Sequence, residues 1–159
     1  MNYNQPRGGG NRNNQHENRT FTNSNPKSEN TPAEPLTEEN YVELAEKAIK
    51  AMKKEGGKKG SALTTSKIRN LLSMSMDLYN DIRESKEEKL NKELVGRINY
   101  LKVRVVYEAG REESVKRFQE NAHLLYYITE IKDSKKKYLL FSRYMEALVA
   151  YHKFEGGRD

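Results

Sequence analysis

Four carboxylates recur at helical spacing in the middle of the chain: Asp77, Asp81, Glu84 and Glu88. Residues four, seven and eleven apart share one face of an α-helix, so this set could hold a divalent cation that activates water. Basic residues interleave with the set, namely Arg83, Lys86 and Lys89. A two-metal site also recruits carboxylates from several elements, and few other aspartates are present. The pattern therefore favours a solvated helix face over a metal centre.

Nucleophiles and general bases are equally sparse. The chain has no cysteine and no Gly-x-Ser-x-Gly element, and nothing in the sequence pairs His16, His123 or His152 with an orienting partner. The loop over residues 56–61 carries Gly and Lys, but it follows an amphipathic helix, and Ser61 comes directly after Gly60 without the lysine of a phosphate loop. These observations predict a protein that is not an enzyme and uses no cofactor.

Basic residues are dense between residues 47 and 69, where eight lysines and arginines accompany one acid, Glu55. A Gly/Lys loop with Lys58 and Lys59 leads into a helix whose first turn combines hydroxyl residues at 64–66 with Lys67 and Arg69. Free backbone N–H groups, hydroxyls and nearby cations can together form a phosphate cradle. The sequence leaves open whether the hydroxyls bind an anion or only cap the helix.

A second basic set follows on the next predicted helices: Arg97, Lys102, Arg104, Arg111, Lys116 and Arg117. Arg97 and Arg104 are seven residues apart and therefore share a face, while residues four apart are separated by roughly 6 Å, close to the phosphate spacing of an extended single strand. Tyrosines could stack on bases, although those in apolar stripes (Tyr41, Tyr79, Tyr138 and Tyr144) are predicted to lie in the core.

The first 35 residues differ in composition from the rest of the chain. They hold all four prolines and are rich in Asn, Gly, Ser, Thr and Glu, with Met1, Tyr3 and Phe21 as their only large apolar residues. Such a segment cannot bury enough apolar surface to offset the entropy lost on ordering. We therefore predict a disordered N-terminal arm over residues 1–35 and one folded domain over residues 36–159.

The net charge of +6, with a sequence pI near 9.3, falls almost wholly on the folded part. This charge points to a polyanionic partner, nucleic acid first and an anionic membrane second, although solubility alone would also explain it. No apolar run approaches the length of a membrane span, about 20 residues, and no signal-peptide core is present. We expect a cytoplasmic protein with no membrane partner.

Apolar residues recur at helical spacing in five segments: residues 37–55, 65–85, 89–109, 112–131 and 135–154. Glycines follow the first, third and fifth segments, as they commonly do at helix ends. Residues 103–107 are β-prone, but no segment alternates with period two and no Asn-Gly or Asp-Gly hairpin turn occurs. The sequence predicts an all-α fold, a compact antiparallel helical bundle of about five helices.

Three sequence motifs follow one another along the folded part of the chain. They are Leu63-Thr-Thr-Ser-Lys-Ile-Arg-Asn-Leu-Leu72, Leu101-Lys-Val-Arg-Val-Val-Tyr-Glu-Ala-Gly-Arg111, and Phe141-Ser-Arg-Tyr-Met-Glu-Ala-Leu-Val-Ala-Tyr-His-Lys153, which is followed by Gly156-Gly157. Together they resemble the small subunit of the Csm-type (type III-A) CRISPR interference complex, over about residues 36–157. The N-terminal arm lies outside the resemblance.

The resemblance implies a non-catalytic subunit present in several copies, stacked head to tail along a guide RNA that pairs with target RNA. It also implies contacts with a repeated backbone subunit and a large polymerase-type subunit, in antiviral defence, with cleavage left to other subunits. The candidate RNA contacts are then Lys67, Arg69, Arg104 and Arg111, whereas residues 146–153 serve packing or subunit contact. A protein-only connector whose basic faces meet acidic partners is the alternative, and a metal-dependent nuclease is least favoured.

Overall fold

The computed structural model describes residues 33–56 and 63–158 and contains six α-helices. They are α1 (Tyr41–Gly56), α2 (Thr65–Glu84), α3 (Lys92–Arg111), α4 (Glu113–Asn121), α5 (Leu124–Ile131) and α6 (Lys135–Phe154). Within those two ranges no strand occurs, and one isolated bridge joins Lys89 to Ser134. The predicted all-α helical bundle is confirmed.

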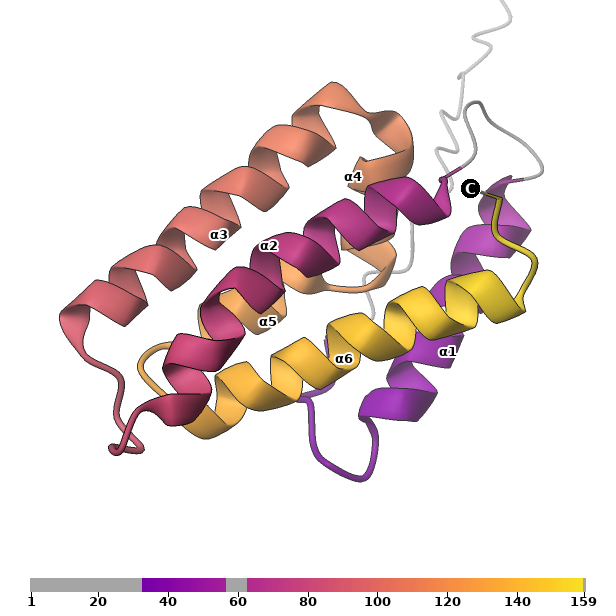
Figure 1. Ribbon diagram of the computed structural model, residues 1–159. Coiled ribbons are helices and arrows are strands. Elements are labelled where there is room, and N and C mark those ends of the chain that lie inside the picture. The colour runs from indigo at the N-terminus through magenta and orange to yellow at the C-terminus, as the bar shows by residue number, and fades with distance from the viewer. Residues whose placement is uncertain (1–32, 57–62, 159) are drawn as a thin grey trace, which may run out of the picture. The chain divides into compact units, whose positions relative to one another are not determined.

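The helices pack around α2 and α6, which lie side by side and run in opposite directions (Figure 1). Helix α6 also packs on α1, while α3 packs on α2, α4 and α5. Figure 1 shows α1 and α3 at opposite sides of the bundle, with α2, α5 and α6 between them. None of the described helices is both long enough and apolar enough to cross a bilayer.

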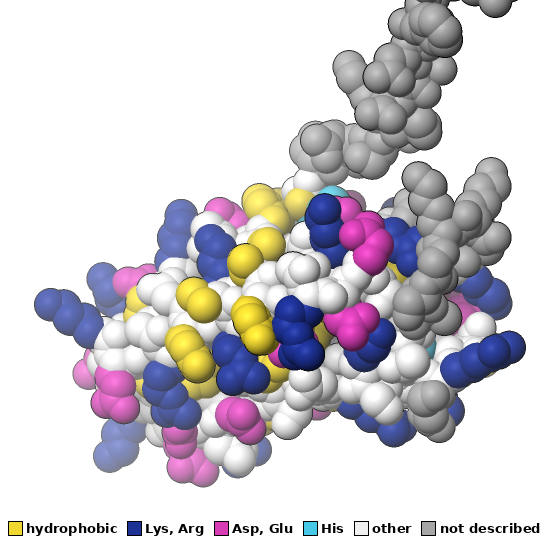
Figure 2. Space-filling view, turned by 90° about the horizontal axis from the view of Figure 1, so that it is seen from above, with side chains coloured by type: hydrophobic (Ala, Val, Ile, Leu, Met, Phe, Trp, Pro, Cys, Tyr) yellow, Lys and Arg dark blue, Asp and Glu magenta, His cyan; other side chains and the backbone are white. Residues whose placement is uncertain are grey.

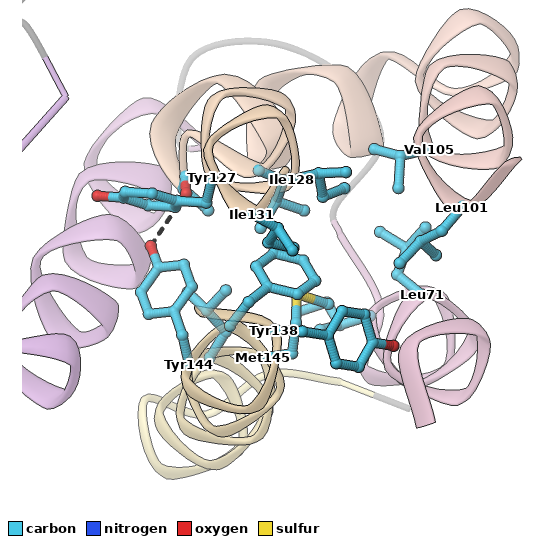
Figure 3. Packing of buried hydrophobic residues seen from close by; sticks show 14 of the residues in the cluster. Leu71, Leu101, Val105, Tyr127, Ile128, Ile131, Tyr138, Tyr144 and Met145 are labelled. Atoms are coloured by element: carbon cyan, nitrogen blue, oxygen red, sulfur yellow. Dashed lines mark hydrogen bonds between the residues drawn. The ribbon is translucent and has the colours of Figure 1, made fainter. Parts of the chain in front are cut away.

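The core is built where apolar stripes of these helices meet. Tyr144 of α6 points toward Tyr127 of α5, whereas the phenol of Tyr138 of α6 points toward α2 (Figure 3). Leu101 and Val105 of α3 complete the cluster. The phenol of Tyr138 donates a hydrogen bond to the Ser75 carbonyl of α2, and that of Tyr144 donates to the Ala122 carbonyl at 3.0 Å. Burial raises the pKa of both phenols, so they remain neutral donors.

The single helix predicted over residues 112–131 is two helices in the structure. Helix α4 ends at Asn121, and His123 adopts a left-handed conformation with φ 49° before α5 begins. The apolar stripe changes register here: Val115 and Phe118 face the core from α4, whereas Leu124 and Ile128 face it from α5. A straight helix would have turned one of these two sets to solvent, so the chain bends between them.

The chain before α1 is held against the bundle from residue 33 onward. The Tyr127 hydroxyl donates to the Glu34 carbonyl at 2.9 Å, and the Asn40 side-chain amide donates to the Pro35 carbonyl at 3.0 Å. Burial raises the pKa of Tyr127 to about 12. Of the disordered arm predicted over residues 1–35, residues 1–32 lie outside the described residues, so the arm stays a prediction.

A strained turn between α5 and α6 gives a first testable expectation. Lys132 lies at φ 53° and ψ −111°, and Ser134 N–H donates to the Ile131 carbonyl at 2.9 Å, as in a type II′ turn. Glycine adopts this conformation without the steric cost that a Cβ brings. We expect Lys132→Gly to raise the free energy of unfolding by about 1 kcal/mol in urea titrations.

Lys132→Ala is the matched control, because alanine removes the same charge and side chain but keeps the Cβ. We expect no comparable gain from it. Equal stabilisation by both substitutions would mean that the lysine side chain, and not the backbone, is the source of the strain.

Candidate nucleic-acid interface

A groove of about 160 Å³ lies between α2 and α3. The α2 side contributes Met74, Asp77 and Leu78, and the α3 side contributes Arg97, Tyr100, Leu101 and Arg104. Helices α2 and α3 run antiparallel here (Figure 1), so the start of α2 lies beside the end of α3. We call this feature the α2–α3 groove.

Three arginines form one row along α3, at Arg97, Arg104 and Arg111. Seven residues make nearly two helical turns, so successive members of this arginine row keep the same side of α3 about 10 Å apart. Buried Leu94, Ile98, Leu101 and Val105 fix the inner face of the helix. The first two arginines consequently lie at its edge toward α2, where they line the groove.

Lys67 adds a fourth cation at the start of α2. Its Nζ lies 2.8 Å from an Oε atom of Glu112, which directly follows Arg111 at the end of α3. Glu112 accepts this hydrogen bond, and the lysine lowers the pKa of the carboxyl. The N-terminal end of α2 and the C-terminal end of α3 thus place Lys67 beside the arginine row.

Most of these cations already form ion pairs with carboxylates of the same chain. Arg97 lies 2.7 Å from Asp81, and Arg111 lies 3.7 Å from Glu108 and stacks over the Tyr107 ring at 5.5 Å. Arg104 is exposed and has no ion-pair or hydrogen-bond partner among residues 33–56 and 63–158. Since ion pairs between exposed groups are weak, a phosphate can exchange with these carboxylates. Arg104 is the cation most accessible to an anion.

Two exposed tyrosines belong to the same surface and were missed by the sequence argument. Tyr100 lines the groove and Tyr107 carries Arg111 over its ring. Each follows an arginine of the row by three residues, Arg97 and Arg104 respectively, and residues three apart are neighbours on a helix. This Arg-x-x-Tyr repeat is the signal that could have found them.

The chain was then compared with known proteins. The family model described as Csm2 Type III-A matches residues 38–158, a range that includes all six helices and the α2–α3 groove. The chain belongs to the Csm2 family. The resemblance inferred from the three motifs is thereby confirmed.

Curated Csm2 proteins show the same relationship. The CRISPR system Cms protein Csm2 of Streptococcus thermophilus is 50% identical over 124 residues, covering 78% of this chain and 98% of its own length. The Csm2 protein of Mycobacterium tuberculosis (strain H37Rv) is 41% identical over the same shares of both chains. That of Enterococcus italicus is 40% identical over 96 residues, 59% of this chain and 69% of its own.

In this Csm2-family chain the other predicted RNA contacts lie apart from the groove. Arg69 is two residues from Lys67, a spacing that places it on another side of α2, and it is exposed there. Lys102 is half-buried on the flank of α3 opposite the arginine row, and Lys116 is exposed on α4. Arg117 lines a separate pocket between the ends of α1 and α6. Lys58 and Lys59 lie outside the described residues.

Two of the three hydroxyl groups at the start of α2 make contacts within the fold. The Thr64 side chain accepts a hydrogen bond from the backbone N–H of Lys67 at 3.3 Å, as an N-cap does. Thr65 is fully buried, and its hydroxyl lies 3.2 Å from Nδ1 of His152. The sequence left open whether these hydroxyls cap the helix or bind an anion, and Thr64 caps it. Ser66 is the exposed residue of the three.

Two residues of the carboxylate face considered for a metal contact an arginine of the groove. The Asp81 carboxylate pairs with Arg97, and the Asp77 carbonyl accepts from the same guanidinium at 3.5 Å. Across residues 33–56 and 63–158, no three His, Asp or Glu side chains come together as metal ligands would. Two of the four acidic residues, Asp77 and Asp81, therefore position a cation of the candidate interface.

His152 joins the end of α6 to the start of α2. Its Nε2 lies 3.2 Å from the Leu63 carbonyl, which can only accept, so the neutral ring donates there and Nδ1 accepts from the Thr65 hydroxyl. Burial of the ring lowers the pKa of His152 below its ordinary value of 6.5. This contact anchors the helix that carries Lys67.

The depressed pKa of His152 gives a pH-dependent stability. Below about pH 6.5 the unfolded chain binds a proton at His152 that the folded chain does not bind. The free energy of unfolding therefore falls as the pH drops below that value. Above that pH the neutral ring contributes its full stabilisation. Urea titrations at about pH 7.5 and about pH 5.5 measure this change. We expect a smaller difference in His152→Gln, and an unchanged difference would assign the effect to other groups.

Proposed function

We propose that the chain is the non-catalytic small subunit of a type III-A CRISPR ribonucleoprotein effector that acts in antiviral defence. Several copies stack along the guide RNA–target RNA duplex, beside the repeated backbone subunit and the large polymerase-type subunit, in the cytoplasm. Membership of the Csm2 family supports the assignment to a type III-A system. The α2–α3 groove is the part of the subunit that contacts RNA.

The arginine row is the observation that carries the RNA contact. A rigid helix holds three guanidinium groups on one line, with Lys67 at one end and two tyrosines alongside. Guanidinium groups bind phosphate in bidentate geometry, and these contacts do not depend on the base. Sequence readout is then left to guide–target pairing, as in other RNA-guided effectors.

Arg104→Ala tests this function in the assembled complex. Because Arg104 has no competing carboxylate in the part of the chain that the structure describes, its loss removes a phosphate contact directly, and target-RNA binding weakens to a similar extent for every matched guide–target pair. The slope of log affinity against log salt becomes shallower by roughly 0.7 per lost contact on a single strand. Filter binding or electrophoretic mobility shift over a salt series measures both quantities.

Arg83→Ala is the matched control. It removes an exposed arginine of α2 that pairs with Glu84 and lies over the Tyr79 ring, outside the residues that line the groove. We expect the same RNA affinity and salt slope as in the unmodified complex. An Arg104→Ala complex that behaves like the control would contradict RNA binding in the groove and favour a protein-only connector.

A further inference from the structure

A second cavity, of about 250 Å³, lies between the ends of α1 and α6, and we call it the terminal pocket. It shares no lining residue with the α2–α3 groove in the part of the chain that the structure describes. Its lining combines an apolar wall with three cations: Ile49, Met52 and Leu63 form the wall, and the cations are Lys53, Arg117 and Arg158. The pocket is therefore a site of its own, with two kinds of contact to offer.

The charges around the terminal pocket favour an anion. Glu155 is the one described carboxylate in the lining, and its Oε atom lies 3.0 Å from Nζ of Lys53. Three positive charges and one negative charge leave the lining at +2, carried by the guanidinium groups of Arg117 and Arg158. Lysines and arginines are spread over the surface with carboxylates among them (Figure 2), so surface charge alone marks no site. Here cations from α4 and from the segment after α6 meet at one cavity.

Side chains, and not the backbone, must hold such an anion. The N–H groups of Glu155, Gly156 and Gly157 already donate to carbonyls in the last turn of α6, at 2.9, 3.1 and 2.8 Å. The His152 ring donates from Nε2 to the Leu63 carbonyl and is neutral. The guanidinium groups are thus the donors that remain, and a guanidinium binds a phosphate through two parallel hydrogen bonds.

The apolar wall is firmly built beside these guanidinium groups. Ile49 and Leu63 are 3% and 9% exposed. The Asn121 amide donates to the Met52 sulfur at 3.6 Å and to the Arg117 carbonyl at 2.9 Å, which holds the end of α1 against α4. An apolar wall next to cations suits a ligand that has a flat apolar part and an anionic group, as a nucleobase with its phosphate has.

The size of the pocket limits the ligand to one such unit. Pockets for drug-sized ligands measure about 300–1,000 Å³, and this one lies just below that range. We propose that the terminal pocket binds one nucleoside monophosphate, with the phosphate on Arg117 and Arg158 and the base on the apolar wall. The nucleotide is free or is the terminal residue of an RNA strand, since both present the same groups. The proposal does not rest on the proposed function.

Isothermal titration calorimetry of the full chain with AMP, adenosine and inorganic phosphate tests the site. We expect AMP to bind with a dissociation constant below about 1 mM. Adenosine lacks the phosphate and inorganic phosphate lacks the base, so we expect each to bind at least about tenfold more weakly. The proposal would be overturned by equal binding of AMP and either fragment, or by no heat of AMP binding up to about 5 mM.

Two substitutions assign the phosphate to its partners. Arg158→Ala and Arg117→Gln each remove one guanidinium group, and we expect AMP affinity to fall about tenfold or more in each. Lys116→Ala is the matched control, because it removes an exposed cation of α4 beside Arg117 that does not line the pocket. Circular dichroism checks the fold of each variant, and the exposed Arg158 carries the test if Arg117→Gln unfolds. Unchanged AMP affinity in Arg158→Ala would overturn the proposal.

Competition then distinguishes the two sources of the nucleotide. Displacement of AMP by a short 5′-phosphorylated oligoribonucleotide, but not by the same strand with a 5′-hydroxyl, assigns the pocket to an RNA end. AMP that stays bound against both strands assigns it to the free nucleotide. Failure of the proposed function is distinguishable, because Arg104 lies in the α2–α3 groove and Arg104→Ala keeps its AMP affinity whatever its effect on RNA.

Discussion

Replacing Tyr138 by alanine is expected to lower the free energy of unfolding by about 3–5 kcal/mol. Tyr138 is fully buried at the start of α6, and its ring and hydroxyl both hold α2, which carries Lys67 and one side of the groove. Truncation removes the ring from the core and leaves the Ser75 carbonyl without this donor. Urea unfolding followed by circular dichroism measures the loss, which is a large part of a typical domain stability of about 5–15 kcal/mol.

Tyr138→Phe separates packing from the hydrogen bond. The ring stays in place and only the hydroxyl is removed, so we expect a loss of about 1–2 kcal/mol. A loss equal to that of Tyr138→Ala would show that the contact with Ser75 dominates and that the ring contributes little. Near-wild-type stability of the alanine variant would contradict the packing described for α2 and α6.

The second large effect is expected at Gly157, just after α6. A Cβ at this position would lie 2.1 Å from Cε1 and 2.2 Å from Nδ1 of His152. Gly157→Ala must therefore displace the imidazole or the C-terminal segment, whose Arg158 carbonyl accepts from the Thr65 N–H at 2.7 Å. We expect a loss of about 2–4 kcal/mol from overpacking and broken hydrogen bonds, measured by the same unfolding titration.

Gly110→Ala is the control for this substitution. Gly110 lies within α3, and a Cβ there would meet nothing within 4 Å. Alanine is the better helix former, so we expect a gain of about 0.5–1 kcal/mol. If the two variants lost stability alike, the close approach of Gly157 to His152 would not be the cause.

Helix positions could be predicted from the sequence because each apolar stripe is long and regular. The stripe of α2 through Ile68, Leu71, Leu78 and Ile82 is buried as its spacing requires. The break at His123 was not predicted, because no residue type at this position marks a left-handed conformation in the sequence. The packing of α4 and α5 on either side fixes that conformation. The change of stripe register near Ala122 was the available signal.

The candidate site was only partly predictable for a different reason. Spacing within one helix predicted that Arg97 and Arg104 share a face, and Arg111 continues their row. Which residues of α2 face α3 depends on helix pairing in space, which places Lys67 beside Glu112 and leaves Arg69 on another side. The assignment of every one of these cations to RNA remains a prediction, for the residues of the groove and equally for Lys58, Lys59, Lys102, Lys116 and Arg117.

The ion pairs along the α2–α3 groove make ligand length decisive. Asp81, Glu108 and Glu112 compete with any anion for Arg97, Arg111 and Lys67, so a lone phosphate or a mononucleotide gains little by displacing one of them. A polynucleotide displaces all three while losing its translational freedom once. The groove would then bind the abundant small anions of the cell weakly and bind polymeric anions such as RNA more tightly.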